Sequence, residues 1–462
     1  MNKQNIEDIY GLTAMQEGML YHSVKNDSTC MYIEQFSCKL TGSINEDYFW
    51  QAWQKVIDDN AVLRTAFLWE GVKKPVQVVL KKCEVSYMQM DWQGLLEEKI
   101  EVEYEKFLRN DRNMGFYLEN APLMRFALIQ IKEDLHYFVW TFHHIIMDGW
   151  SLPLVIEQML HNYRAIQNHT SVAMEDKKGQ YKNYIKWLND QDANKAKAYW
   201  KEVMQEGQDV VAFTQIQSQG ENHKKAYRFE LELENEIKTF LKKNTLTEYQ
   251  LFNCAYAIML SKYFGKENVI YGVTVSGRNM QIPKINEIVG IFINTVPQTV
   301  SLQANAKVKD VFEAIKKQQL ERSSYEYLSI SDICSTCGKQ KLFDSIFVLE
   351  NYANADSYKN IAEFAISDLK LHEEVNFPLA WVLKHEDGIC VESVYNTAYF
   401  TDEIIESLLN CYVTIISELL GHYEEQVDTI QLVESSKGSI VTDVEDVNGN
   451  SLEYRFLQGK KL

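Results

Sequence analysis

The stretch LHYFVWTFHHIIMDGWSLPLVIEQMLHNY, residues 135–163, gives the clearest indication of the fold. Its first part, residues 137–142, is a run of aromatic and β-branched side chains, which predicts a buried strand. Ser151 is predicted to be the N-cap of a following helix, with Pro153 tolerated in the first turn. Apolar side chains then recur at helical spacing on one face, namely Leu152, Val155, Ile156, Met159, Leu160 and Tyr163. Residues 143–149 are therefore expected to form a turn between a core strand and a packed helix.

This turn contains the residues that could carry chemistry, which are His143, His144, Asp148 and, through its backbone, Gly149. Two imidazoles and a carboxylate held between rigid elements suit acid–base catalysis. A histidine at the end of a strand is more often structural, so residue types alone leave both readings open. A metal site is disfavoured, because adjacent strand residues point to opposite faces and the two imidazoles would not converge on one ion.

Strand-like and helix-like segments alternate along the chain, which predicts an α/β or α+β fold. At 462 residues, the chain fits two domains of about 200 residues each. The order strand, helix, strand occurs in both halves, at residues 31–40, 44–58 and 62–69 and again at 227–233, 247–265 and 269–275. The helix of the second half is expected to begin with a capping box, Thr247 to Gln250, and to end at Gly265.

The boundary between the two halves is placed in their most polar interval, residues 167–201. We expect an N-terminal lobe over residues 1–180 and a C-terminal lobe over residues 181–434. Beyond that lobe the sequence becomes rich in Ser, Gly and Asp, with a hairpin-like turn at Asn448-Gly449. Residues 435–462 are therefore expected to be an appended tail or linker.

The formal net charge is −18, which disfavours nucleic acid as a general partner because like charges repel. No run of about 18 apolar residues is apparent, so we expect no helix that spans a membrane. Residues 1–18 lack the apolar core of a secretory signal. The eight cysteines are scattered, and the Cys334–Cys337 pair lacks a second pair of ligands for zinc. We therefore expect a cytoplasmic protein with reduced thiols and no bound metal.

The order His-His-x-x-x-Asp-Gly at residues 143–149 resembles the active-site motif of the condensation domains of non-ribosomal peptide synthetases. These domains belong to a wider acyltransferase family related to chloramphenicol acetyltransferase. Further segments resemble other motifs of the family in the expected order, namely LTAMQEGML (12–20), LRTAF (63–67), YKNYIKW (181–187), SGR (276–278), VGIFINT (289–295) and FDSIFVLENY (343–352). The resemblance covers roughly residues 10–434.

This resemblance implies two chloramphenicol-acetyltransferase-like lobes arranged as a V with a central tunnel. It also implies an acyltransferase that joins a carrier-bound acyl or peptidyl thioester to the amine of an acceptor aminoacyl thioester. The phosphopantetheine arms would be substrates, delivered by separate donor and acceptor carrier proteins, and the chain itself would hold no cofactor. The chain would act as a monomer or as part of a larger synthetase.

For the motif residues, the resemblance implies that His144 is catalytic. It either accepts the ammonium proton of the acceptor, or holds the amine and stabilises the tetrahedral intermediate. His143 is expected to brace the loop, and Asp148 to pair with Arg278 across the lobes. Gly149 is expected to permit close backbone approach near the oxyanion, although a simple turn glycine explains it nearly as well.

Four further residues are assigned to the surroundings of the site. Arg64 is expected to support the active-site loop, or else to pack as part of a core strand. Asn294 and Thr295 are expected to line the substrate channel or to join the lobes. Trp150 is expected to border the donor side of the channel, with simple packing as the alternative.

The segments MQEGML, HHIIMDGWSLPL and FVLENY look most like the subclass that receives a donor whose last residue is D-configured. Residues 323–330 fit the sixth motif of the family only loosely. Three alternatives stay open. They are a free-standing amide or ester synthase that uses a soluble amine or alcohol, a related epimerisation domain, and a catalytically silent recruitment module.

Overall fold

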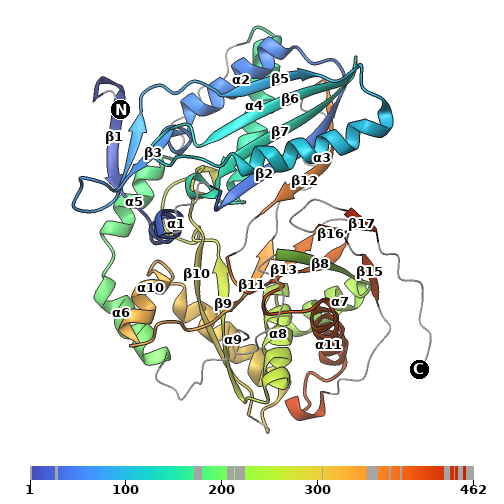
Figure 1. Ribbon diagram of the computed structural model, residues 1–462. Coiled ribbons are helices and arrows are strands. Elements are labelled where there is room, and N and C mark those ends of the chain that lie inside the picture. Colours follow the sequence, from blue (N-terminus) through green and yellow to red (C-terminus); the bar gives the residue numbers. More distant parts are fainter. Residues whose placement is uncertain are drawn as a thin grey trace. The chain divides into compact units, whose positions relative to one another are not determined.

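The computed structural model describes residues 3–25, 30–170, 179–204, 213, 224–303, 305–350, 363–373, 376–385, 388–430, 438–441, 443–445 and 451–453. These residues form both helices and sheets, so the predicted mixed α/β class is confirmed (Figure 1). The chain divides into two compact units, and each is described by itself. Unit 1 comprises Met1–Gln191, Ser276–Ile293 and Tyr352–Glu374, and unit 2 comprises Asp192–Val275, Asn294–Asn351 and Val375–Leu462.

Both units are discontinuous in sequence, unlike the expected lobes of residues 1–180 and 181–434. The first change of unit, at residue 191, falls inside the polar interval that marks the expected boundary. Residues 276–293 and 352–374 nevertheless belong to unit 1, although they come late in the chain. Composition along the sequence cannot reveal this arrangement, because it arises from packing between distant segments.

Unit 1 is built on a five-stranded sheet in the order β12-β2-β7-β6-β5. The bounds are β2 (Ile33–Thr41), β5 (Tyr87–Asp91), β6 (Met124–Lys132), β7 (Leu135–His143) and β12 (Ala365–His372). Neighbouring strands are antiparallel except that β5 runs parallel to β6. β7 is the central strand, and helices cover both faces of the sheet (Figure 1). Its side chains are therefore buried from His136 to His143 instead of alternating between buried and exposed.

Alternate side chains of this sheet contact different helix layers. The layers are α2 (Glu46–Asp59) and α4 (Ser151–Gln167) on one face and α3 (Glu97–Asn113) on the other. On the first face, the Trp53 ring of α2 lies 4.4 Å from that of Phe126 and 5.1 Å from that of Trp140. Full burial of a large apolar side chain contributes about 1.5–3 kcal/mol. This packing holds the end of β7 and the start of α4 in fixed places.

Unit 1 also contains a three-stranded sheet in the order β1-β4-β3. The remaining elements of the unit are η1 (Lys3–Asn5), β1 (Ile6–Gly11), α1 (Ala14–Lys25), η2 (Ala61–Arg64), β3 (Thr65–Leu68), β4 (Val76–Leu80), η3 (His144–Ile146), α5 (Tyr181–Asn189) and η5 (Ile285–Glu287). The strand predicted at residues 62–69 is shorter than expected, because residues 62–64 belong to the 3-10 helix η2. The strand and helix predicted before it correspond to β2 and α2.

The start of α4 differs from the prediction by one residue. Ser151 is the first helical residue and Trp150 is the N-cap, so the predicted Ser151 cap is wrong. The Oδ1 atom of Asp148 accepts a hydrogen bond from Ser151 N at 3.1 Å. A carboxylate three residues upstream therefore satisfies the first helical N–H, which leaves the Ser151 hydroxyl to other partners.

Unit 2 contains a seven-stranded sheet in the order β10-β9-β11-β13-β14-β8-β15. The strands are β8 (Lys224–Leu231), β9 (Asn268–Val275), β10 (Asn294–Ser301), β11 (Ser345–Glu350), β13 (Leu379–His385), β14 (Ile389–Asn396) and β15 (Gly438–Val441). β11 runs parallel to β9 and β13, and the other neighbours are antiparallel. The helices are α6 (Ala193–Val203), α7 (Glu234–Asn244), α8 (Glu248–Phe264), α9 (Val308–Arg322), α10 (Ile330–Thr336), α11 (Asp402–Gly421) and η7 (Val427–Thr429).

The helix α8 is buried in the core of unit 2 and confirms both of its predicted ends. Thr247 Oγ1 accepts from Gln250 N at 3.3 Å, and Gln250 Oε1 accepts from Thr247 N at 3.0 Å, which completes the capping box. Gly265 ends the helix in the left-handed conformation, with φ +61°. Both signals are local in sequence, which explains why they could be predicted.

The C-terminal tail begins as part of unit 2 instead of as a separate appendage. β15 pairs antiparallel with β8, with Gly438 opposite Leu231, so the prediction is wrong for residues 438–441. β16 (Asp443–Glu445) and β17 (Ser451–Glu453) then pair with each other. The predicted Asn448-Gly449 turn lies outside the described residues. Without β15, that edge of β8 would present unpaired backbone groups, and a further strand can satisfy such groups.

By length and composition alone, α11 could cross a membrane, which differs from the expectation drawn from the sequence. Half of its apolar window is buried inside the protein. Leu409, Tyr412 and Ile416 are among its buried side chains, and all three belong to the core of unit 2. These contacts identify α11 as a core helix.

Candidate active site

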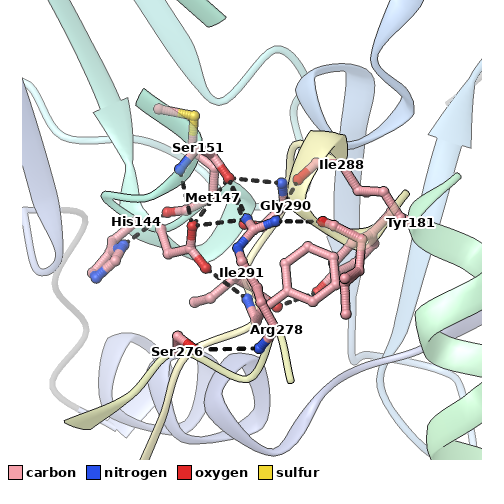
Figure 2. A network of polar contacts seen from close by, with 12 residues as sticks. His144, Met147, Ser151, Tyr181, Ser276, Arg278, Ile288, Gly290 and Ile291 are labelled. Carbon is pink, nitrogen blue, oxygen red and sulfur yellow. Dashed lines mark hydrogen bonds and ion pairs between the residues drawn. The ribbon is translucent and has the colours of Figure 1, made fainter. Parts of the chain in front are cut away.

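His144 lies where β7 ends and the 3-10 helix η3 begins. Its backbone N–H donates to Tyr32 O at 2.9 Å, and its ring Nδ1 lies 2.8 Å from Met147 O (Figure 2). A carbonyl oxygen can only accept, so Nδ1 carries the hydrogen in this contact. In a neutral ring, Nε2 is then the unprotonated nitrogen, and a half-buried imidazole held in this way can accept a proton there.

His143 has a different environment, although it is the adjacent residue. Its side chain is buried, and Nδ1 accepts a hydrogen bond from Ile145 N at 3.0 Å. Burial, and secondarily the neighbouring His144, lowers the pKa of His143 to about 3. The neutral ring of His143 thus accepts a backbone N–H from inside the loop.

The Asp148 carboxylate is fully buried and has a partner on each oxygen. Oδ1 lies 3.0 Å from Ser151 Oγ and 3.3 Å from the Nη2 atom of Arg278. Oδ2 accepts from Phe292 N at 2.8 Å. Burying a charge is costly unless it is paired and hydrogen-bonded, and these contacts meet that condition. Asp148 therefore stabilises the backbone of the active-site loop.

Arg278 makes the ion pair with Asp148 that was expected, but both residues belong to unit 1. The expectation that this pair joins two lobes is therefore corrected by the packing of residues 276–293 in unit 1. Nη1 of Arg278 also donates to Ile285 O at 2.7 Å and to Ile288 O at 3.0 Å. Burial lowers the pKa of the guanidinium, and the Asp148 carboxylate opposes this effect.

Ser151 joins the active-site loop to residues 276–293. Its hydroxyl accepts from Gly290 N at 3.1 Å and lies 2.9 Å from Gly290 O, and Asp148 N also donates to Gly290 O at 3.2 Å. Figure 2 shows Ser151, Gly290 and Arg278 gathered in this network, with the His144 ring turned away from it. The network therefore fixes the backbone while leaving the imidazole outside it.

Two glycines allow residues 276–293 to approach this closely. Gly277 has φ +62°, and a Cβ atom there would overlap the carbonyl of Phe292. A Cβ atom at Gly290 would overlap the ring of Tyr181, whose hydroxyl donates to Ile291 O at 2.8 Å. Side chains at either position would push the segment away from the loop.

The other predicted site residues lie in several places. Gly149 is half-buried, and its carbonyl accepts from Leu152 N in the first turn of α4, while Trp150 is 40% exposed. In unit 2, Asn294 Nδ2 donates to the carbonyls of Glu326 and Leu328, and Thr295 N donates to Asn294 Oδ1. These bonds show Asn294 anchoring a loop to β10.

Arg64 lies in unit 1, where its side chain contacts residues outside the active-site loop. Its Nη1 atom forms an ion pair with Glu7 at 2.6 Å and donates to the carbonyl of Leu80. Both partners belong to the three-stranded sheet β1-β4-β3. The structural reading of Arg64 is the one that these contacts support.

Sequence reasoning did not identify three residues that hold the loop. The sequence predicts only a helix cap at Ser151 and no individual role for Tyr32 or Gln16. Gln16 donates to Ile145 O at 3.1 Å. A usable signal existed for Gln16, because Thr13 and Gln16 have the same capping-box spacing as Thr247 and Gln250. Nothing local marks Tyr32, which acts through its carbonyl.

Comparison with known proteins shows the family. The family model described as "Condensation domain" matches residues 6–439. One of the linear gramicidin synthase proteins of Brevibacillus parabrevis is 30% identical over 462 residues, which cover 98% of this chain and 6% of that protein. Surfactin synthase subunit 3 of Bacillus subtilis (strain 168) is 30% identical over 440 residues, which cover 94% of this chain and 34% of that protein. The chain therefore spans a small part of the curated relatives that it matches.

Solved structures agree at the level of the fold. The first condensation domain of the calcium-dependent antibiotic synthetase, in complex with a substrate analogue, has a TM-score of 0.76 at 16% identity. That likeness covers 95% of this chain and 100% of that one. The starter condensation domain of rhizomide synthetase has a TM-score of 0.76 at 17% identity, covering 92% and 100%. The chain belongs to the condensation-domain family of non-ribosomal peptide synthetases.

Proposed function

We propose that the chain forms an amide bond between a carrier-bound acyl or peptidyl thioester and the amine of a carrier-bound aminoacyl thioester. The observation that carries this proposal is the contact between His144 Nδ1 and Met147 O, which leaves Nε2 able to accept a proton. The same tautomer allows Nε2 to hold the amine by accepting one of its N–H groups, and then to take its proton as the C–N bond forms. We therefore assign proton acceptance to His144 Nε2.

The bond changes follow from this assignment. The amine nitrogen attacks the thioester carbonyl, a C–N bond forms, and His144 Nε2 takes the proton that the nitrogen loses. The tetrahedral intermediate then collapses, the C–S bond breaks, and the donor thiol leaves with a proton returned by the imidazole. Proton transfer by a positioned side chain contributes typically 10²–10⁴-fold, and holding the two reactants together adds to it.

The remaining roles belong to the same proposal. The active-site loop is held by His143, Asp148 and Arg278. Gly149 has no side chain and leaves space for the reacting carbonyl next to the loop. Trp150, which is 40% exposed at the start of α4, borders the donor, and Asn294 and Thr295 contribute to the channel wall. In this scheme Arg64 stabilises unit 1 at a place away from the reacting groups.

The partners that we propose are a donor and an acceptor carrier protein, each with a phosphopantetheine arm that is a substrate. The chain itself would bind no cofactor and would work in the cytoplasm, where its eight cysteines stay free thiols as they are in the structure. The segments MQEGML and FVLENY support a donor whose last residue is D-configured. The curated relatives are synthases much longer than this chain, which supports action within a larger synthetase.

The test uses carriers loaded with donor and acceptor thioesters, with products followed by mass spectrometry. We expect amide product from the native chain and a loss of about 10²-fold or more in His144→Ala. The matched control is His161→Ala, because the His161 side chain is 59% exposed on α4. Full turnover by His144→Ala would overturn the proposed role of the imidazole.

The same assay separates the alternative functions. Product formed only with a soluble amine or alcohol would show a free-standing synthase, and exchange of the α-proton without a new bond would show an epimerisation domain. Binding of loaded carriers without turnover would show a recruitment module. Separate donors that end in D- and L-residues test the proposed stereochemistry, and equal rates would contradict it.

A further inference from the structure

Gln16 is a buried polar residue of α1 whose side chain reaches the active-site loop. It is 1% exposed, and its Nε2 atom lies 3.1 Å from Ile145 O and 3.0 Å from Gln77 Oε1. Ile145 directly follows His144 and belongs to η3. The loop is therefore held by a side chain that is 129 positions away in the sequence.

The chemistry of its partners fixes the orientation of the Gln16 amide. Thr13 N donates to Oε1 at 2.9 Å, and a backbone N–H cannot accept, so the oxygen must face Thr13. The nitrogen then faces Ile145 O, which can only accept. Gln16 N also donates to Thr13 Oγ1 at 3.2 Å, so this end of α1 is closed by a capping box. Both hydrogens of the amide are used.

Gln77 connects Gln16 to a rigid part of unit 1. It is 0% exposed and lies in β4, opposite Tyr10 of β1 and Phe67 of β3. Its Nε2 atom donates to Gly11 O at 2.8 Å, which leaves its Oε1 atom for Gln16. The amide of Gln16 is thus anchored on the middle strand of the three-stranded sheet, whereas His144 follows the central strand of the five-stranded sheet.

The bond to Ile145 O constrains the imidazole indirectly. The carbonyl of Ile145 marks the plane of the peptide between residues 145 and 146. Rotation of that peptide would displace Met147, whose carbonyl lies 2.8 Å from His144 Nδ1. A donor on Ile145 O therefore restrains the orientation of the ring through the backbone that connects Ile145 to Met147.

We propose that Gln16, anchored by Gln77, is a positioning residue for His144 that keeps the Met147 carbonyl in place and so keeps Nε2 as the proton acceptor. This role rests on the proposed catalytic use of His144. Gln16 does not touch the reacting atoms. It acts on the rate of the chemical step and not on the binding of either carrier.

The first experiment is Gln16→Leu, which keeps a side chain of similar size and removes all three side-chain hydrogen bonds. We expect kcat to fall by on the order of 10²-fold, as for a small misplacement of a reacting group, with KM for each carrier nearly unchanged. Gln77→Leu should reduce kcat less, because Gln16 keeps its bond to Ile145. A rise in KM as large as the expected fall in kcat, with kcat itself unchanged, would contradict a positioning role.

The matched control is Gln54→Leu in α2. Gln54 has the same set of bonds, since its Nε2 atom donates to Cys83 O and Asp58 Oδ1 at 2.9 Å each and its Oε1 atom accepts from Val85 N at 2.9 Å. Its partners lie in another part of unit 1. Gln54→Leu should lower the free energy of unfolding and leave kcat unchanged. A similar loss of kcat in both variants would show that Gln16 acts only through stability.

Gln16→Glu provides a readout that a purely structural residue would not give. An ionised carboxylate would face Ile145 O without a hydrogen to donate, whereas the protonated acid can donate one. We therefore expect the ratio of kcat in Gln16→Glu to that in Gln16→Leu to rise as the pH falls. The ratio cancels any pH effect on the amine itself. A ratio that stays constant with pH would overturn the proposed donor role.

A measurement without catalysis separates this inference from the proposed function. Nitrogen chemical shifts of ¹⁵N-labelled histidine report which ring nitrogen is protonated, and His144→Ala identifies the signals. We expect the Nδ1–H form of His144 in the native chain and in Gln54→Leu, and a mixture of forms in Gln16→Leu. Full activity of His144→Ala would defeat the proposed function, whereas an unchanged His144 tautomer and kcat in Gln16→Leu would defeat only the positioning role.

Discussion

At the scale of single residues, two adjacent histidines have opposite properties because they lie on opposite sides of the end of a strand. His143 is buried and accepts a backbone N–H from Ile145, whereas the ring of His144 is partly exposed and bonded to Met147 O. Burial disfavours the charged form of an imidazole. The pKa of His143 therefore falls to about 3, with burial as the largest cause and His144 as the second.

Because the pKa of His143 is lowered on folding, the free energy of unfolding depends on pH in the acid range. Between pH 6.5 and about 3, the unfolded chain binds a proton at His143 that the folded chain does not bind. Stability therefore falls as the pH drops through 6.5, by up to about 1.4 kcal/mol per pH unit from this group. In His143→Asn, the side-chain oxygen can still accept from Ile145 N but does not titrate. Urea unfolding between about pH 7 and pH 5 should show a shallower loss of stability in this variant.

The control is His161→Asn, which changes an exposed histidine of α4. It should leave the pH dependence of unfolding as in the native chain. Equal slopes in His143→Asn and in the native chain would contradict the assignment of this acid sensitivity to His143.

At the scale of elements, the active-site loop depends on a segment that comes much later in the chain. Residues 276–293 supply the Arg278 side chain, the Phe292 N–H and both backbone groups of Gly290. α5 supports this segment from the other side through the Tyr181 hydroxyl on Ile291 O. The loop, the segment and α5 therefore pack as one structural group.

At this scale we predict that Gly290→Ala loosens the packing between the active-site loop, residues 276–293 and α5. The added Cβ would overlap the Tyr181 ring, and overpacking of this kind typically costs about 1–3 kcal/mol. The segment should move away from Ser151, so amide formation should also fall. Thermal unfolding and the carrier assay measure the two effects.

Gly18→Ala is the matched control for this substitution. Gly18 lies in α1, and nothing lies within 4 Å of its added Cβ. Alanine should stabilise the helix by up to about 1 kcal/mol and leave activity unchanged. If Gly290→Ala behaved in the same way as Gly18→Ala, the close packing against Tyr181 would have no energetic importance.

At the scale of the whole molecule, the chain forms two compact units, each with its own core. Every described β-sheet lies within one unit, including the sheets that combine distant segments. In unit 1, β12 pairs with β2, and in unit 2, β15 pairs with β8. Such long-range pairings define the units more directly than position along the chain does.

Ending the chain at residue 437 tests this view for β15. The backbone groups of β8 (Lys224–Leu231) that pair with β15 would then face solvent. Hydrogen exchange at β8 should become faster, while exchange in the five-stranded sheet of unit 1 should stay unchanged. Unaltered exchange in β8 would show that residues 438–441 do not protect it.

Elements that depend on neighbours in the chain can be predicted from the amino-acid order. The apolar run of β7, the capping box at Thr247 and the stop at Gly265 are set by periodicity and local hydrogen bonding, and each agrees with the structure. The same local signals placed His143, His144 and Asp148 in one turn between a strand and a helix. Family resemblance added the pairing of Asp148 with Arg278.

The distant groups that hold that turn are visible in the folded protein and not in the sequence. Arg278 and Asp148 are 130 positions apart within one unit, Gln16 reaches Ile145 O, and the hydroxyl of Ser151 contacts Gly290 instead of capping its own helix. These contacts leave no periodic trace in the sequence, because they depend on how separate elements pack and on which buried polar groups remain to be satisfied. A side chain's partner in the folded protein is therefore fixed by the whole unit.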